Sequence, residues 1–79
     1  MPRLPDDDEW LLRERRAIGD RIRVRRLREN MTQEKVFLEA RVSRSAYQAV
    51  EAGTADARIT TLLRIATVLG VHVTDLLHD

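Results

Sequence analysis

Apolar residues recur with a helical period along most of the chain, and the first such run is the longest. Leu11, Ile18 and Ile22 are seven and four residues apart, a spacing that puts them on one face of a helix. Carboxylates stand at the start of this run, where they favour a helix N-terminus. Asn30 follows the run and tolerates a left-handed backbone. The pattern therefore predicts a helix over about residues 8–29.

Two shorter helices follow, over 33–40 and 44–52, with a brief turn between them. Thr32 and Ser43 precede these helices and are suitable N-caps, because their hydroxyls accept hydrogen bonds from free backbone N–H groups. Gly53 is typical of a residue just past a helix C-terminus. Helical spacing selects the residues of these two helices that we expect to face inward: Val36, Ala40, Ala46, Tyr47 and Val50.

The last third of the chain predicts a helix over 59–69 and a short one over 73–77. Gly70 ends the first of them. No run alternates apolar and polar residues as a half-buried strand would. We therefore expect an all-α protein of five helices. Leu62, Ile65, Ala66 and Leu69 stand at helical spacing in the first of these helices, and the short last helix carries Leu76 and Leu77.

Length and composition limit what this chain can be. Seventy-nine residues, 43% of them apolar and 34% charged, suit one small soluble domain with a modest core. The chain has no cysteine, which excludes disulfides and thiolate sites, and His72 and His78 are too few for most histidine metal sites. There is no apolar run of membrane-spanning length and no secretion signal, so we expect a cytoplasmic, nucleoid-associated protein that binds no cofactor or metal.

The charge is balanced overall but not along the chain. Residues 1–12 carry a net charge of −3, residues 13–44 carry +6, and residues 45–79 carry −2. We expect 1–12 to be an N-terminal extension and 13–79 to be the binding domain. Thirteen of the fourteen basic residues are arginines, whose forked donors grip phosphates and guanine edges as lysine cannot. The alternative interpretation is a set of solvated helix faces.

The segment over residues 32–53 carries the functional signal. Two short helices, each opening with a hydroxyl cap and joined by a turn of about three residues, have the spacing of a helix-turn-helix. In such a unit the second helix lies in the major groove and presents its first turn to the bases. The small, polar or cationic residues at the start of the second helix suit that role: Ser43, Arg44, Ser45, Gln48 and Ala49.

Four segments together resemble the Cro and phage-repressor-like helix-turn-helix family, often called the XRE family. They are IGDRIRVRRLRENMTQEK, VSRSAYQAVEAG, TLLRIATVLGV and TDLL, and the resemblance runs from about Ile18 to Leu77. It implies a compact five-helix, lambda-repressor-like domain with a central helix-turn-helix. It also implies sequence-specific binding of double-stranded DNA, used to regulate transcription.

The resemblance also assigns roles to particular residues. Core positions fall on Leu62, Ile65, Ala66, Leu69, Val71, Leu76 and Leu77. Base-reading positions fall on Arg44, Ser45, Gln48 and Ala49. Phosphate contacts are expected from Gln33, Thr32, Ser43, Arg41, Arg25 and Thr54. Arg26 and Glu51 match a structural pair that ties the first helix to the third. A homodimer is expected through the last helix, with Val73, Leu76 and Leu77 as the seam and Trp10 as the runner-up.

Three positions depart from the family pattern. Phe37 stands where a small residue is usual, so its ring is expected to turn outward or to widen the crossing of the two short helices. Arg41 replaces a glycine in the turn, which costs about 1 kcal/mol if the backbone there is left-handed. The loop over 54–58 is poor in cations, and Asp56 in it would repel a phosphate.

Two other classes of function remain open beside DNA binding. The acidic start and weakly charged loop are compatible with an antitoxin or another protein-interaction module on the same scaffold. A purely structural, assembly role is the second alternative. An enzyme is not expected, because the serines lack a nearby His–acid pair and there is no glycine-rich phosphate loop.

Overall fold

A computed structural model describes residues 8–78, and this part of the chain is all-α. The helices are α1 (Glu9–Arg28), α2 (Gln33–Ala40), α3 (Arg44–Ala52), α4 (Ile59–Leu69) and α5 (Thr74–Leu77). Each predicted boundary lies within one residue of the observed one. Within 8–78 no strand forms, which confirms the predicted class. The first seven residues of the expected N-terminal extension lie outside the described residues.

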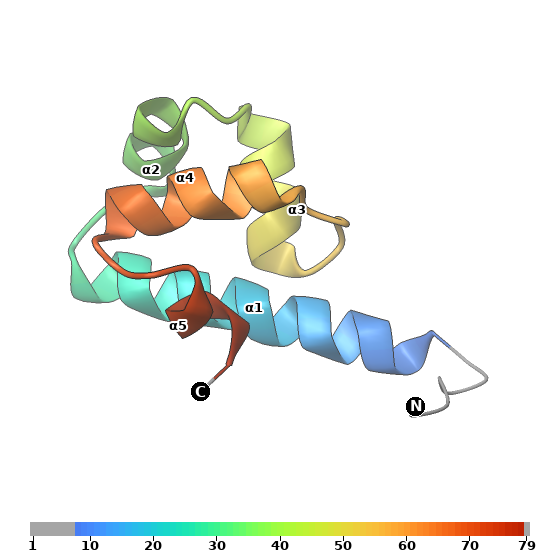
Figure 1. Cartoon of the computed structure of the whole chain (residues 1–79). Coiled ribbons are helices and arrows are strands. Elements are labelled where there is room, and N and C mark those ends of the chain that lie inside the picture. Colours follow the sequence, from blue (N-terminus) through green and yellow to red (C-terminus); the bar gives the residue numbers. More distant parts are fainter. Residues whose placement is uncertain (1–7, 79) are drawn as a thin grey trace.

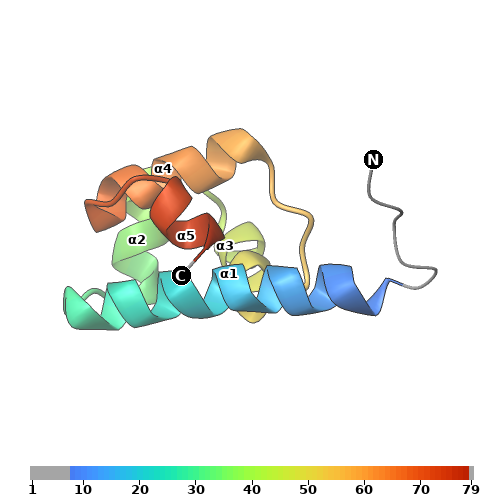
Figure 2. The same cartoon turned by 60° about the horizontal axis from the view of Figure 1, so that its bottom comes forward.

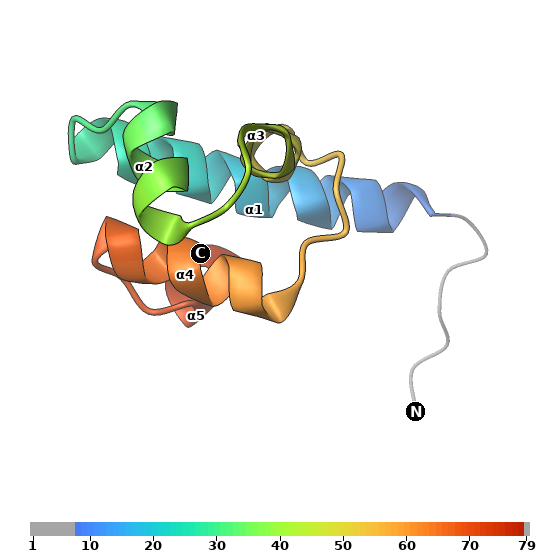
Figure 3. The same ribbon diagram turned by 90° about the horizontal axis from the view of Figure 1, so that it is seen from above.

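Helix α1 is straight and lies along the bottom of the fold in Figure 1, and the other helices pack on one side of it. α3 runs nearly perpendicular to α1. It is upright in Figure 1, and in Figure 3, the view from above, it is seen end-on. α4 packs on α2, and α5 returns to α1 (Figure 2). The N-terminal half of α1 projects beyond the other helices in each of these views. This arrangement places α2 and α3 side by side, away from that projecting end.

Local sequence signals explain where the two short helices begin and end. The Thr32 hydroxyl accepts a hydrogen bond from the Lys35 N–H at 3.0 Å. The Ser43 hydroxyl accepts one from the Ala46 N–H at 3.2 Å. Each bond satisfies one of the backbone donors that a helix N-terminus leaves free. Gly53 ends α3 with φ +77°, a left-handed conformation that glycine adopts without strain.

The core gathers one apolar stripe from each helix. Ala46 was expected inward but is exposed, because α3 buries Tyr47, Val50 and Glu51 and turns Ala46 about 100° away from Tyr47. Leu77 was also assigned to the core and is 44% exposed. The buried apolar residues are Ile22, Val36, Phe37, Ala40, Tyr47, Val50, Leu62, Ile65, Ala66, Leu69 and Leu76.

Gly19 allows the end of α3 to rest directly on α1. A Cβ atom at this position would lie 2.4 Å from the Glu51 carbonyl oxygen and 2.7 Å from the Val50 carbonyl oxygen. Both atoms belong to backbone, so they cannot move aside cheaply. The missing side chain therefore sets how closely the two helices approach.

Two of the family departures have structural outcomes. Phe37 does not turn outward: it is only 6% exposed, and its ring lies 6.3 Å from that of Tyr47 at an interplanar angle of 48°. Tilted aromatic pairs at this separation are favourable, so the core uses the ring as packing volume. Arg41 has φ +58°, so the backbone there is left-handed and the cost expected of a non-glycine residue applies.

Candidate nucleic-acid interface

The leading end of α3 is polar and open to solvent. Arg44, Ser45 and Gln48 are exposed and Ala49 is half-buried, while the opposite side of the helix packs inward. α2 lies beside it and holds it through packing and the turn at Arg41. All four sequence-predicted base-reading residues therefore lie on one accessible helix face.

Arg44 is guided by two side chains of α2. Its guanidinium carbon lies 5.3 Å from the centre of the Phe37 ring, within the range of a cation–π interaction. Its Nη2 donates to a Glu34 carboxylate oxygen at 3.4 Å. Both members of this ion pair are more than half exposed, so solvent screens it strongly. The Arg44 side chain is thus held against α2 without being buried.

A chain of polar side chains joins this exposed surface to the interior. The Gln33 amide nitrogen donates to Glu51 Oε1 at 3.3 Å. The Gln48 amide nitrogen reaches Gln33 Oε1 at 3.5 Å. Gln33 therefore braces α2 against α3 through its side-chain amide.

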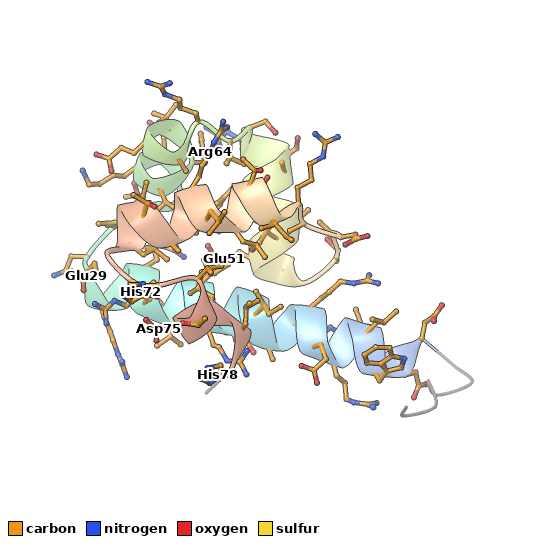
Figure 4. The ribbon with its side chains drawn as sticks, in the orientation of Figure 1. Glu29, Glu51, Arg64, His72, Asp75 and His78 are labelled. Atoms are coloured by element: carbon orange, nitrogen blue, oxygen red, sulfur yellow. The ribbon has the colours of Figure 1, made fainter. Side chains whose placement is uncertain are left out.

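The Arg26–Glu51 pair anchors the other end of α3. Arg26 Nε donates to Glu51 Oε2 at 3.1 Å, and Arg26 Nη2 donates to Oε1 at 2.8 Å. A third donor of Arg26 bonds the Met31 carbonyl at 3.0 Å. Glu51 lies between α3 and α1 (Figure 4). The expected pair is present and has the two-pronged geometry that makes arginine–carboxylate contacts strong.

Burial and hydrogen bonding act in opposite directions on Glu51. Burial disfavours the ionised carboxylate, but the hydrogen bonds from Arg26 and Gln33 outweigh it and lower the pKa of Glu51. The hydrogen bond to Glu51 also raises the pKa of Arg26. Burial, reinforced by the Glu51 carboxylate, raises the pKa of Tyr47. The site keeps a fixed ion pair beside a neutral phenol.

The predicted phosphate ligands divide into two groups. Thr32, Ser43 and Arg41 are exposed at the ends of α2 and α3, and Thr54 donates its hydroxyl to the Ala49 carbonyl at 3.3 Å. Arg25 does not join them. It lies in a groove between α1 and α5 and pairs with Glu29 at 3.2 Å. Arg25 is one residue from Arg26, which points to α3, so helical rotation turns it toward α5.

The predicted dimer seam also needs one correction. Leu76 is 2% exposed and belongs to the core of its own protomer, so its side chain offers no seam. It is buried because α5 is a single turn that packs this residue against α1. Leu77 is exposed, and Val73 and Trp10 are half-buried.

Sequence reasoning missed Glu34 and Phe37 as neighbours of Arg44. Both lie in α2, and Phe37 is one helical turn beyond Glu34. The sequence shows that Glu34 and Phe37 share one face of α2. That this face meets Arg44 follows only from the packing of α2 against α3. Among the described residues, no group of His, Asp and Glu could hold a metal ion, and no helix is long and apolar enough to cross a membrane.

Comparisons with known proteins agree with this geometry. The family model described as helix-turn-helix, HTH_3, matches residues 22–76. Among curated protein sequences the search found no match.

Three solved structures share the fold. The restriction-modification controller protein C.AhdI from Aeromonas hydrophila is 25% identical, covers 81% of this chain and 97% of its own, and has a TM-score of 0.78. The clp gene regulator ClgR from Corynebacterium glutamicum is 27% identical over 80% of this chain and 67% of its own, with a TM-score of 0.75. The hypothetical transcription factor NHTF from Neisseria is 23% identical over 100% of this chain and 87% of its own, with a TM-score of 0.79.

The matched residues run from the middle of α1 to α5 and include the whole of the α2–turn–α3 unit. The chain therefore belongs to the helix-turn-helix family HTH_3, the XRE or Cro-like group of non-enzymatic, DNA-binding transcription regulators.

Proposed function

We propose that this regulator recognises a specific double-stranded DNA sequence by placing the leading end of α3 in the major groove. One observation carries the proposal: Arg44, Ser45 and Gln48 are exposed together at that end. The same helix is fixed at its other end by the Arg26–Glu51 pair. A reading surface needs both exposure and a rigid support, because misplaced donors lose their hydrogen bonds to bases.

Phosphate contacts set the register of α3. The N-termini of α2 and α3 carry exposed hydroxyl caps and the positive ends of two helix dipoles, which favour phosphate. Arg41 lies in the turn between them and is exposed. These groups hold the backbone of the duplex while α3 contacts base edges.

Arg44 is the side chain that we expect to give most of the base discrimination. Its guanidinium forms two parallel hydrogen bonds with the O6 and N7 atoms of guanine, a contact that contributes about 1–3 kcal/mol of discrimination. Glu34 holds this group at 3.4 Å in the free protein. Because the pair is exposed, its loss on binding costs little.

We also propose that the regulator binds DNA as a homodimer. A single module of this size buries on the order of 600–1,000 Å² on DNA, which limits its specificity. Two copies reading half-sites about one helical turn apart double the number of contacted bases.

The test is selection from a random duplex library, followed by binding titrations with the variants Arg44→Ala and Arg64→Ala. Arg64 is an exposed α4 arginine, so its variant is matched in charge. We expect the selected site to be bound with a steep salt dependence. Arg44→Ala is expected to lose preference at one base pair in each half-site, and Arg64→Ala to keep it. A selection that yields no enriched sequence, or equal behaviour of the two variants, would overturn the proposal.

A further inference from the structure

Helix α1 carries apolar residues on two opposite faces. Ile18 and Ile22 point toward the core, as expected of a surface helix. Trp10, Ala17 and Val24 form a second set on the side away from the core, and Val24 is 45% exposed. A helix of a monomeric domain needs only one apolar stripe, so the second one is available to another surface.

The second set has the spacing of a helix-pairing seam. Its members are seven residues apart, and seven residues make two helical turns less roughly 20°. Trp10 therefore lies two helical turns before Ala17 and Val24 two turns after it, and each is rotated slightly to an opposite side of Ala17. We call these three residues the α1 stripe. Its small central residue permits close approach of a second helix there.

A groove opens beside the α1 stripe, between α1 and α5. It has a volume of about 860 Å³, and Arg21 closes part of it by donating a hydrogen bond to the Leu76 carbonyl at 3.1 Å. Its walls are both apolar and cationic: Ala17, Asp20, Arg21, Val24, Arg25, Arg28, Val71, Asp75 and Leu76. The groove lies on the same side of α1 as Trp10, because helical rotation places Trp10 and Arg21 on one side of Ala17.

The charges that flank the α1 stripe are arranged with opposite sign in its two halves. Arg13 and Asp20 lie along one flank, and Glu14 and Arg21 lie along the other. If a second α1 runs antiparallel about a two-fold axis at Ala17, each flank of one copy meets the same flank of its partner in reverse order. Arg13 then faces Asp20 of the second copy, and Glu14 faces Arg21. Both pairs are complementary, and symmetry repeats each of them.

These observations lead us to infer that a second copy of this chain docks on the α1 stripe, antiparallel, with Trp10 of each copy in the α1–α5 groove of the other. The reversed order puts Trp10 opposite Val24 of the second copy, at the level of the groove. The indole covers apolar wall there, and the guanidinium groups of Arg25 and Arg28 lie near its face. The mixed lining of the groove suits an indole better than a purely aliphatic side chain.

This pairing extends the homodimer of the proposed function by giving it a surface. The α1 stripe shares no residue with the exposed face of α2 and α3, so docking leaves that face open. The inference concerns association without DNA, and it is tested without DNA. Its failure is therefore distinguishable from failure of sequence recognition, which a monomer bound to a half-site would still show.

The first measurement combines sedimentation equilibrium with fluorescence of the full chain. Trp10 is the sole tryptophan, so its emission reports on this contact alone. We expect a dimer whose formation shifts the emission to shorter wavelength and protects the indole from acrylamide. A chain that stays monomeric, or a dimer that forms with no change at Trp10, would overturn the inference.

Charge reversal tests the antiparallel register. Arg13→Asp places like charges opposite each other twice per dimer, and we expect the dimer dissociation constant to rise roughly tenfold. The double variant Arg13→Asp with Asp20→Arg restores opposite charges and is expected to recover most of that loss. Arg64→Asp has the same change of charge outside the stripe and should behave as the unchanged chain. Equal effects of Arg13→Asp and Arg64→Asp, or no recovery in the double variant, would contradict the register.

Cross-linking separates the α1 stripe from the last helix as the pairing surface. The chain has no cysteine of its own, so Ala17→Cys and Leu77→Cys each introduce a single thiol. Ala17 lies at the two-fold axis of the inferred dimer, and we expect its cysteine variant to form a disulfide-linked dimer on mild oxidation. Leu77→Cys is the matched exposed control. Cross-linking through position 77 and not through position 17 would overturn the inference.

Discussion

The trailing end of α3 is buried and holds a fixed ion pair, whereas its leading end is exposed and holds weak polar contacts. Glu51 is 6% exposed and receives two hydrogen bonds from Arg26, at 3.1 Å and 2.8 Å. Arg44, seven residues earlier, makes one ion pair at 3.4 Å and is more than half exposed. The two ends teach that one short helix separates its support from the recognition of DNA that we propose for it. The supporting charges are buried, and the charges proposed to exchange partners on DNA are left in solvent.

The largest expected effect comes from breaking the support. Glu51→Ala leaves the Arg26 guanidinium buried without its partner, which is expected to lower the free energy of unfolding by about 3–5 kcal/mol. Urea denaturation followed by circular dichroism measures this loss. The matched control is Glu34→Ala at the exposed end, where the expected change is below about 1 kcal/mol. Equal changes in the two variants would remove the contrast between the two ends.

Acid is expected to weaken the same support without a mutation. The pKa of Glu51 is lowered in the folded protein, so the unfolded chain binds a proton there more readily. The stability from this group is present above the usual glutamate pKa of about 4.3 and is lost as the pH falls through the lower folded value. As the pH is lowered from neutral to strongly acidic, the melting temperature of Glu51→Gln should therefore fall less steeply than that of the unchanged chain. Parallel curves for the two proteins would count against the lowered pKa.

A smaller effect is expected where the core meets the reading surface. Phe37→Leu keeps an apolar residue in the core and is expected to cost about 1 kcal/mol of stability. It also removes the ring beneath Arg44, and an exposed cation–π contact contributes about 0.5–1 kcal/mol. We therefore expect a few-fold loss of affinity for the selected duplex, measured by fluorescence anisotropy on the folded variant. Leu38→Ala, exposed on the same helix, serves as control and should leave affinity unchanged.

The smallest effect is expected at the exposed pair. Glu34→Gln removes a carboxylate that competes with DNA for Arg44, so affinity should rise by about two- to five-fold, since exposed pairs contribute at most about 1 kcal/mol. The rise should shrink as salt is added, because salt screens exposed charges. Anisotropy titrations at two salt concentrations measure both trends. A loss of affinity would mean that Glu34 positions Arg44 instead of restraining it.

The two short helices of the helix-turn-helix were predictable because their ends carry local signals. Thr32 and Ser43 cap their helices with hydroxyl hydrogen bonds, and Asn30 and Gly53 adopt the left-handed conformation that their residue types favour. These signals act within a few residues, so they can be read along the chain. The Arg26–Glu51 pair came instead from the family resemblance, since its members are 25 residues apart.

Features that depend on packing between helices were predicted less well. Phe37 was expected either to turn outward or to widen the crossing of the two short helices, and its ring is buried beside that of Tyr47. Arg25 was assigned to phosphate, but the position of α5 places it in a groove on another side of α1. Leu76 was assigned to a seam and fills the core. In each case the deciding neighbour comes from a different helix, and residue spacing within one helix does not encode it.

Gly19 has a consequence for how this protein can change over time. Its empty side-chain position faces backbone atoms of α3, so even a methyl group there would push the two helices apart. Exposed residues of the proposed recognition surface can be replaced one at a time without moving the helices, whereas this glycine cannot. We expect duplicated copies of the gene to diverge in their DNA targets long before they diverge at this crossing point.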